Sequence, residues 1–323
     1  MNRTFLVAAT LLCAHICLAD PNPATTPEAA AQATPKPAPV GPKPTLADVP
    51  YGASPKQALD FYQTESATPT PLVFMIHGGG WTHGSKSQVG VTAYLKAGIS
   101  VVSIEYRFTQ EAKAAGVKPP VEWPMHDAAR ALQFVRSKAA EWNIDKARIG
   151  ATGGSAGACT SLWLAFHDDM ADPKSSDPIA RESTRLWCAA VKSPQTTLDP
   201  QQMKDWTPNS KYGGHAFGFK SDGKKHTTQF EEFLAGREKV LPWIKEYSPY
   251  ELVSAGDPPI YMSFEAPPAL GQEQKDPTHT ANFGVKLQEH CQENGVECEL
   301  VYPGAPDVKH ANIDLYLIEK LKK

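Results

Sequence analysis

The chain has 323 residues, of which 41% are hydrophobic and 21% are charged, so it is long enough for one large α/β domain or two small domains. A formal net charge of -3 gives no electrostatic reason to expect nucleic acid as a partner. No apolar run reaches the roughly 18 residues of a membrane span, so we expect no stable membrane insertion.

The N-terminus has the pattern of a secretory signal peptide. Arg3 supplies the positive charge, a mostly apolar stretch follows over residues 5–18, and small residues precede an expected cleavage site after Ala19, giving a signal peptide over 1–19. Residues 20–47 are rich in Pro and Ala, cannot form a core and are expected to be an extended linker. We therefore expect a secreted or periplasmic protein whose folded domain covers 48–323.

Within that domain, strand-like runs alternate with helix-like segments. The strand-like runs cover 72–76, 99–106, 148–153, 186–192, 259–264 and 296–302. The helix-like segments cover 125–142, the residues directly after Ser155, 282–293 and 313–321. Apolar strands that alternate with helices indicate an α/β fold with a mostly parallel central sheet and helices on both faces.

A first glycine cluster, 77–81, directly follows the strand-like run 72–76 and reads His-Gly-Gly-Gly-Trp. Glycine allows bare backbone N–H groups to point at developing negative charge, as an oxyanion hole requires. We expect the N–H groups of Gly79 and Gly80 to be such donors, and His77 to shape the loop rather than to react.

A second glycine cluster, 153–157, has the Gly-x-Ser-x-Gly form of a nucleophile elbow. It predicts Ser155 as nucleophile and the N–H of Ala156 as a third oxyanion donor. A plain glycine-rich turn or a phosphate-cradling loop is the alternative, but the spacing is not the Gly-x-Gly-x-x-Gly of a dinucleotide site. The two clusters together favour acyl transfer, most simply ester hydrolysis.

A long segment, 196–250, interrupts the alternation before the penultimate strands and is rich in aromatic residues. Connections in compact domains are usually about 2–6 residues long, so we interpret this segment as an insertion that forms a lid or a substrate wall. A surface excursion with its own small core is the alternative.

The acid and the base are expected after the serine, in that order along the chain. Asp276 follows the strand-like run 259–264 and is the predicted acid, with Glu265 as main rival and Asp199 as an outside choice. Asp307 is disfavoured because it lies close to the predicted base, His310.

His310 is the predicted base because it follows the last strand-like run and a turn, and precedes a terminal helix. The other histidines that follow the serine remain as rivals: His167, His215, His226, His279 and His290. Of these, His167 and His290 lie where structural roles are expected.

Four cysteines remain after the expected signal peptide: Cys159, Cys188, Cys291 and Cys298. Cys291 and Cys298 flank an expected helix-to-strand turn and could close a short disulfide, whereas the other two lie in apolar segments typical of core thiols. No Cys-x-x-Cys or His-Glu-x-x-His motif appears, so we expect no dedicated metal site.

Further motifs accompany the two glycine clusters, at 105–107, 124–127, 143–145, 148–150, 258–259, 276–277 and 302–304. Together these residues resemble the secreted α/β-hydrolase-fold serine esterases, near the hormone-sensitive-lipase-like and bacterial feruloyl-esterase-like branches. The resemblance covers most of 71–323, implies a serine hydrolase without a cofactor and supports the acid role of Asp276. With the base predicted above, the expected triad is Ser155–Asp276–His310. The chain departs from the family pattern by inserting 266–275 before the acid and by lacking a clear N-terminal helical cap.

The resemblance implies a serine-dependent carboxylic-ester hydrolase acting through an acyl-enzyme on Ser155. The expected substrates are small acyl esters, such as acetyl or feruloyl groups on carbohydrate. A lipid or short-chain acylglycerol esterase is one alternative. A non-catalytic binding protein on a hydrolase scaffold is another, although such proteins normally lose the serine, the histidine or the oxyanion glycines.

Overall fold

The structure is a computed structural model that describes residues 41–87, 89–219 and 226–323. The expected signal peptide and the expected linker up to residue 40 lie outside the described residues. Strand β1 begins at Leu46, just before the expected start of the folded domain. No helix of the described ranges is long and apolar enough to cross a membrane.

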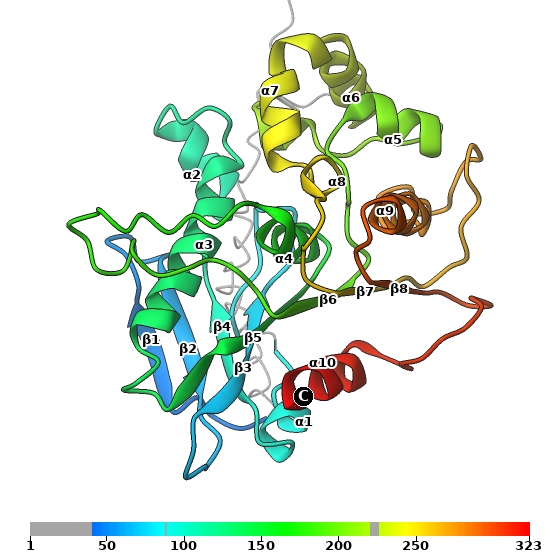
Figure 1. The fold of residues 1–323 in the computed structure, drawn as a ribbon. Helices are drawn as coiled ribbons and strands as arrows, with labels where there is room; N and C mark the ends of the chain where they lie inside the picture. The colour runs from blue at the N-terminus through cyan, green and yellow to red at the C-terminus, as the bar shows by residue number, and fades with distance from the viewer. Residues whose placement is uncertain (1–40, 88, 220–225) are drawn as a thin grey trace, which may run out of the picture. The chain divides into compact units, whose positions relative to one another are not determined.

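One eight-stranded sheet runs through the domain in the order β1-β2-β4-β3-β5-β6-β7-β8 (Figure 1). The strands are β1 (Leu46–Pro50), β2 (Ala58–Tyr62), β3 (Thr70–Ile76), β4 (Ser100–Ile104), β5 (Ile144–Gly154), β6 (Cys188–Lys192), β7 (Ile260–Ser263) and β8 (Cys298–Val301). All neighbours from β4 to β8 pair in parallel, whereas β1 and β2 pair antiparallel at one edge. The mostly parallel α/β-hydrolase sheet predicted from the sequence is confirmed.

Helices cover both faces of this sheet (Figure 1). On one side lie α1 (Thr92–Lys96) and α10 (Ile313–Lys322), and on the other lie α3 (Glu122–Ser137), α4 (Ala156–Phe166) and α9 (Asn282–Glu293). Strand β3 serves both layers, because Phe74 and Ile76 pack in the core beneath α4 while Val73 and Met75 pack with α1 and α10. A short helix, α2 (Thr109–Ala114), precedes α3.

The expected insertion forms a mainly helical segment above α4. It contains α5 (Pro200–Trp206), the 3₁₀ turn η1 (Gly214–Phe217), α6 (His226–Ala235), α7 (Arg237–Tyr247) and α8 (Pro249–Leu252). Phe217, Phe230 and Phe233 are buried together within it and join the main core cluster. The aromatic residues that marked the segment in the sequence therefore hold it together and attach it to the domain.

The strand register brings the two glycine clusters side by side. Ile76, the last residue of β3, pairs with Gly153 near the end of β5, and Gly153 also pairs with Val191 of β6. Because carboxyl ends of parallel strands meet at one edge of the sheet, the loops after β3, β5, β6 and β7 converge there.

The four cysteines in the described part of the chain are free thiols. The short disulfide considered for Cys291 and Cys298 is not formed; instead the two side chains hydrogen-bond, and together with burial this raises the pKa of Cys298 well above its ordinary value. Cys159 and Cys188 are buried, as expected for core thiols.

Candidate active site

The backbone bends sharply at Ser155, which lies between β5 and α4. Its φ of 53° and ψ of -120° are unusual for a residue with a side chain, a strain that clusters at functional sites. A Cβ on Gly157 would lie 2.1 Å from the carbonyl oxygen of Ile76, and one on Gly153 would lie 2.5 Å from the same atom. Both glycines are therefore required for β5 and α4 to fold back against β3.

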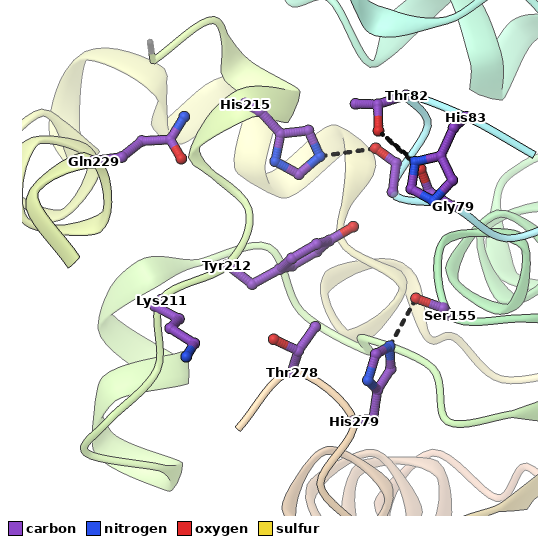
Figure 2. A pocket seen from close by; sticks show the side chains of 11 residues that line it. Gly79, Thr82, His83, Ser155, Lys211, Tyr212, His215, Gln229, Thr278 and His279 are labelled. Atoms are coloured by element: carbon purple, nitrogen blue, oxygen red, sulfur yellow. Dashed lines mark hydrogen bonds between the residues drawn. The ribbon is translucent and has the colours of Figure 1, made fainter. Parts of the chain in front are cut away.

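The hydroxyl of Ser155 meets the imidazole of His279, with 2.9 Å between Oγ and Nε2 (Figure 2). On the far side of the ring, Nδ1 lies 2.8 Å from Oδ2 of Asp276. An ionised carboxylate only accepts hydrogen bonds, so Nδ1 carries the proton and Nε2 accepts from the serine hydroxyl. The three side chains form a continuous hydrogen-bonded chain in the geometry of a nucleophile, a base and an orienting acid.

A single turn after β7 supplies both Asp276 and His279. The N–H of His279 donates to the carbonyl of Asp276 at 3.3 Å, and the N–H of Thr278 donates to Oδ1 of Asp276 at 3.1 Å. Pro277 occupies the second position of this turn, where its fixed φ is favourable. The buried side chain of Gln195, after β6, donates to the carbonyl of Thr278 at 2.7 Å and so fixes the turn to the sheet.

Asp276 is held in its ionised form. Burial opposes ionisation, but the hydrogen bond and charge of His279 and the backbone N–H groups of Thr278 and His279 outweigh it, so the pKa of Asp276 lies below its ordinary value.

The prediction that His310 meets Ser155 is wrong. Its Nδ1 lies 2.6 Å from Glu299 and its Nε2 lies 2.9 Å from Glu319, so both ring nitrogens are engaged away from the elbow. His279 was one of the rival histidines. The signal that distinguishes it is the Asp-Pro-Thr-His sequence, in which the acid and the histidine are three residues apart across a proline turn.

The rival acids have other partners. Glu265 forms an ion pair of 2.6 Å with Lys192 at the rim of a separate pocket. Asp199 accepts from the N–H of Gln201 at the start of α5 and pairs with Arg237 at 2.6 Å. Asp307 lies in the loop after β8.

The carbonyl groups of Gly78 and Gly79 in the 77–81 loop are engaged in hydrogen bonds to neighbouring groups. The oxygen of Gly79 accepts from the N–H groups of Thr82 and His83 at 3.0 and 3.2 Å, and from the Thr82 hydroxyl at 3.0 Å. Because N–H and C=O are antiparallel in a trans peptide, this fixes the N–H of Gly80 in the opposite direction. No hydrogen bond between described residues uses the N–H of Gly79 or Gly80.

His77 fixes the preceding peptide in the same manner. Its Nδ1 lies 2.8 Å from the oxygen of Gly78, which also accepts from the Tyr106 hydroxyl at 3.2 Å. The His77 ring stacks on Tyr106 at 4.2 Å, and its Nε2 lies 3.4 Å from Glu105. His77 therefore shapes the loop, and the N–H groups of Gly79 and Gly80 are left without a hydrogen-bond partner among the described residues.

A pocket of about 580 Å³ opens above the serine, within the usual size range of small-molecule sites. The lining residues are Gly79, Gly80, Thr82, His83, Ser155, Lys211, Tyr212, His215, Gln229, Thr278 and His279. Ala156, the first residue of α4, is buried beneath it. Four of the lining residues come from the insertion, so this segment forms one wall of the pocket (Figure 2). Within the described ranges, no cluster of side chains could hold a metal ion.

The insertion is attached to both sides of this site. His215 places Nε2 2.9 Å from the carbonyl oxygen of Gly80 (Figure 2). On the opposite side, the Asn209 side chain donates to the oxygen of Gln274 at 2.9 Å and accepts from its N–H at 3.0 Å. The fully buried Asn282 donates to the oxygen of Trp206 at 2.8 Å. These contacts fix the insertion to the 77–81 loop and to the turn that carries Asp276 and His279.

The remaining rival histidines lie outside the hydrogen-bonded chain. His167 pairs with Glu246 at 3.0 Å and His290 with Glu293 at 3.2 Å. The side chain of His226 lies outside the described residues.

Comparisons with known proteins agree with this fold. The chain is 31% identical over 132 residues to gut esterase 1 of Caenorhabditis elegans, covering 39% of this chain and 24% of the relative. It is 33% identical over 114 residues to esterase LipC of Mycobacterium tuberculosis, covering 33% and 26%. The chain thus spans about a quarter of the length of these curated relatives.

Solved structures show the same fold at lower identity. A truncated carbohydrate esterase from gut microbiota matches with a TM-score of 0.62 and 20% identity, covering 86% of this chain and 96% of that one. An acetyl ester-xyloside bifunctional hydrolase from Caldicellulosiruptor lactoaceticus matches with a TM-score of 0.56 and 24% identity, covering 76% of each chain.

The family comparison gives the assignment. The BD-FAE family model matches residues 59–265, a range that includes both glycine clusters and Ser155 and ends before Asp276. Since this match covers more than half of the chain, and the sheet and elbow are those of an α/β-hydrolase, the protein belongs to the BD-FAE family.

Proposed function

We propose that this protein is a serine-dependent carboxylic-ester hydrolase with Ser155, His279 and Asp276 as its catalytic triad. The observation that carries the proposal is the hydrogen-bonded chain from Ser155 through His279 to Asp276, at 2.9 and 2.8 Å, beside the free N–H groups of Gly79 and Gly80. The esterase relatives support the same activity.

The reaction proceeds in two halves. His279 Nε2 accepts the hydroxyl proton while Ser155 Oγ attacks the ester carbonyl carbon, and the carbonyl oxygen becomes an oxyanion next to the N–H groups of Gly79, Gly80 and Ala156. The tetrahedral intermediate collapses, the bond to the alcohol oxygen breaks, and His279 returns the proton to the departing alcohol. Water then attacks the acyl-enzyme with His279 again as base, which releases the carboxylic acid and restores the serine.

The proposed substrates are small acyl esters, with acetyl or feruloyl groups on carbohydrate as the first class to examine. The pocket of about 580 Å³ is lined by several polar side chains, among them the exposed Lys211, which suits a hydrophilic alcohol. The carbohydrate-ester names of two structural neighbours support the same class. Short-chain acylglycerols are the alternative substrates.

Hydrolysis of p-nitrophenyl acetate by residues 41–323 and its variants tests the triad. Ser155→Ala and His279→Gln are expected to lower kcat by at least about 10³-fold, because nucleophile or base is lost. Asp276→Asn is expected to lower kcat by roughly 10³–10⁴-fold, because the wrong imidazole tautomer is then favoured.

His310→Gln is the matched control, since it makes the same substitution at the histidine that the structure places away from Ser155. It is expected to retain turnover close to that of the unmodified protein. A loss of turnover in His310→Gln with normal turnover in His279→Gln would overturn the assignment. A protein that neither hydrolyses esters nor labels at Ser155 with a fluorophosphonate would instead be a binding protein.

A further inference from the structure

The charged or chargeable nitrogen groups that line the catalytic pocket are basic, and no carboxylate lies among the described lining residues. The basic side chains are those of His83, Lys211, His215 and His279. Among the described residues, the carboxylate of Asp276 lies behind His279, on the side of the ring away from Ser155, where it accepts a hydrogen bond from Nδ1. A substrate in this pocket therefore meets a fixed positive charge at Lys211 and no compensating negative charge from the lining residues.

Lys211 extends from the insertion toward Thr278, on the side of Tyr212 that faces His279 (Figure 2). Its side chain makes no ion pair or hydrogen bond with any described residue, and it is exposed to solvent. The charge is thus available to a ligand.

The position of Lys211 is fixed relative to the catalytic turn. Asn209, two residues earlier, makes its pair of hydrogen bonds with Gln274, two residues before Asp276. Ser210 donates to the oxygen of Met203 at 3.0 Å. The backbone before Lys211 is therefore attached to the turn that carries His279, which places the start of the Lys211 side chain on that side of the pocket.

The side of the pocket on which Lys211 lies determines whether it meets the alcohol half or the acyl half of an ester. His279 must contact the oxygen of the leaving alcohol to protonate it, so the alcohol half lies on the His279 side of Ser155. The acyl oxygen lies on the opposite side, at Gly79 and Gly80. Thr278 and Lys211 belong to the His279 side.

We propose that Lys211 selects esters whose alcohol half carries an anionic oxygen group, a carboxylate or a sulfate, and this inference rests on the proposed ester hydrolysis. On carbohydrate, such alcohols are acylated uronic acids or acylated sulfated sugars. Neutral esters enter the same pocket without the ion pair.

The test compares acetyl esters of phenols whose para substituent is either anionic or neutral. The probes are 4-acetoxybenzoate and 4-acetoxyphenyl sulfate, against the neutral 4-acetoxybenzamide, with each kcat/KM divided by the uncatalysed hydrolysis rate. The protein is expected to prefer the anionic esters by roughly 5- to 50-fold, the range from an exposed ion pair to a charge-assisted hydrogen bond. Preference for one anion over the other identifies which group the pocket takes.

Substitution of Lys211 then tests the cause. Lys211→Met is expected to bring the anionic-to-neutral ratio close to one, and Lys211→Arg to retain most of it. The control Lys204→Met, which removes an exposed lysine of α5 outside the pocket lining, is expected to leave the ratio unchanged. The preference should also fall as salt is raised, since exposed charges are screened within about 8 Å at physiological ionic strength.

An anionic-to-neutral ratio of kcat/KM that is equal in the unmodified protein and in Lys211→Met would overturn the inference. If hydrolysis still depended on Ser155 in that case, the proposed function would stand. Absence of any Ser155-dependent hydrolysis would instead tell against the proposed function. Calorimetric binding of 4-hydroxybenzoate and 4-hydroxybenzamide to Ser155→Ala, with and without Lys211→Met, then decides the inference without turnover. Equal affinities would overturn it, and a carboxylate preference that requires Lys211 would support it.

Discussion

The two ring nitrogens of His310 hydrogen-bond to Glu299 and Glu319, and these contacts make the stability of the fold depend on pH. Burial disfavours the charged ring, but the hydrogen bonds and charges of the two carboxylates outweigh it, so the pKa of His310 is raised above its ordinary value. A histidine with a higher pKa in the folded state stabilises the fold fully below its unfolded pKa of about 6.5, and this contribution is lost as the pH rises through the folded pKa.

His310→Gln is therefore expected to lower the free energy of unfolding more at pH 6 than at pH 9. Urea denaturation at the two pH values measures the difference. An equal loss at both values would mean that the ring contributes through packing against Tyr316 rather than through its charge.

At the level of single residues, the sequence predicted what local backbone geometry dictates. Ser155 and the two glycines at the elbow were predicted from a motif whose spacing is set by steric contact. Gly79 and Gly80 were predicted as oxyanion donors because glycine leaves the backbone N–H groups accessible. The choice of His279 over His310 depends on how the loop after β7 folds back over the sheet. Both histidines follow a strand, and apart from the Asp-Pro-Thr-His spacing it is the three-dimensional path of the chain that brings His279 to Ser155.

At the level of elements, the insertion acts as a fixed wall. Nε2 of His215, in η1, lies 2.9 Å from the carbonyl oxygen of Gly80, and this contact orients the peptide that follows the proposed oxyanion donor. His215→Ala is expected to lower kcat for p-nitrophenyl acetate by roughly 10- to 100-fold, somewhat less than the loss of a whole oxyanion donor. KM should change little, because the contact acts through the loop that binds the transition state.

His215→Gln keeps an N–H donor of similar reach and is expected to recover much of the lost kcat. An Ala variant with normal kcat would contradict the positioning role. A fall in both variants together with a lower melting temperature would indicate a structural role instead.

The elements that sequence reasoning located are those with an unambiguous pattern. The parallel strands are continuous apolar runs, and α3 has apolar residues at helical spacing. Strands β1 and β2 were missed because they lie at the antiparallel edge, where the pairing of β2 with β4 and of β1 with β2, rather than a local pattern, makes them strands. The insertion was recognised by its length, but its attachment through Asn209 and Asn282 depends on contacts between distant segments.

At the level of the whole molecule, we propose that the chain is exported and that residues 1–19 are removed. Expression of the full chain in a host with a secretory pathway is expected to give a mature protein that begins at Asp20. Intact-mass measurement of the exported protein checks this, with a variant that replaces Ala19 by a bulky residue as the control. A cytosolic protein of uncleaved mass would contradict the proposal.

The turn from Asp276 to His279 has a consequence for how such a site can be inherited or built. The proposed acid and base are carried by four consecutive residues, so a deletion, a graft or a recombination event moves them as one cassette. The loop after β8 takes no part in the proposed proton transfer, so its sequence can change without loss of Asp276 or His279. For an engineer, a scaffold that already presents an elbow serine needs one short turn, rather than two separately placed loops, to acquire the rest of the triad.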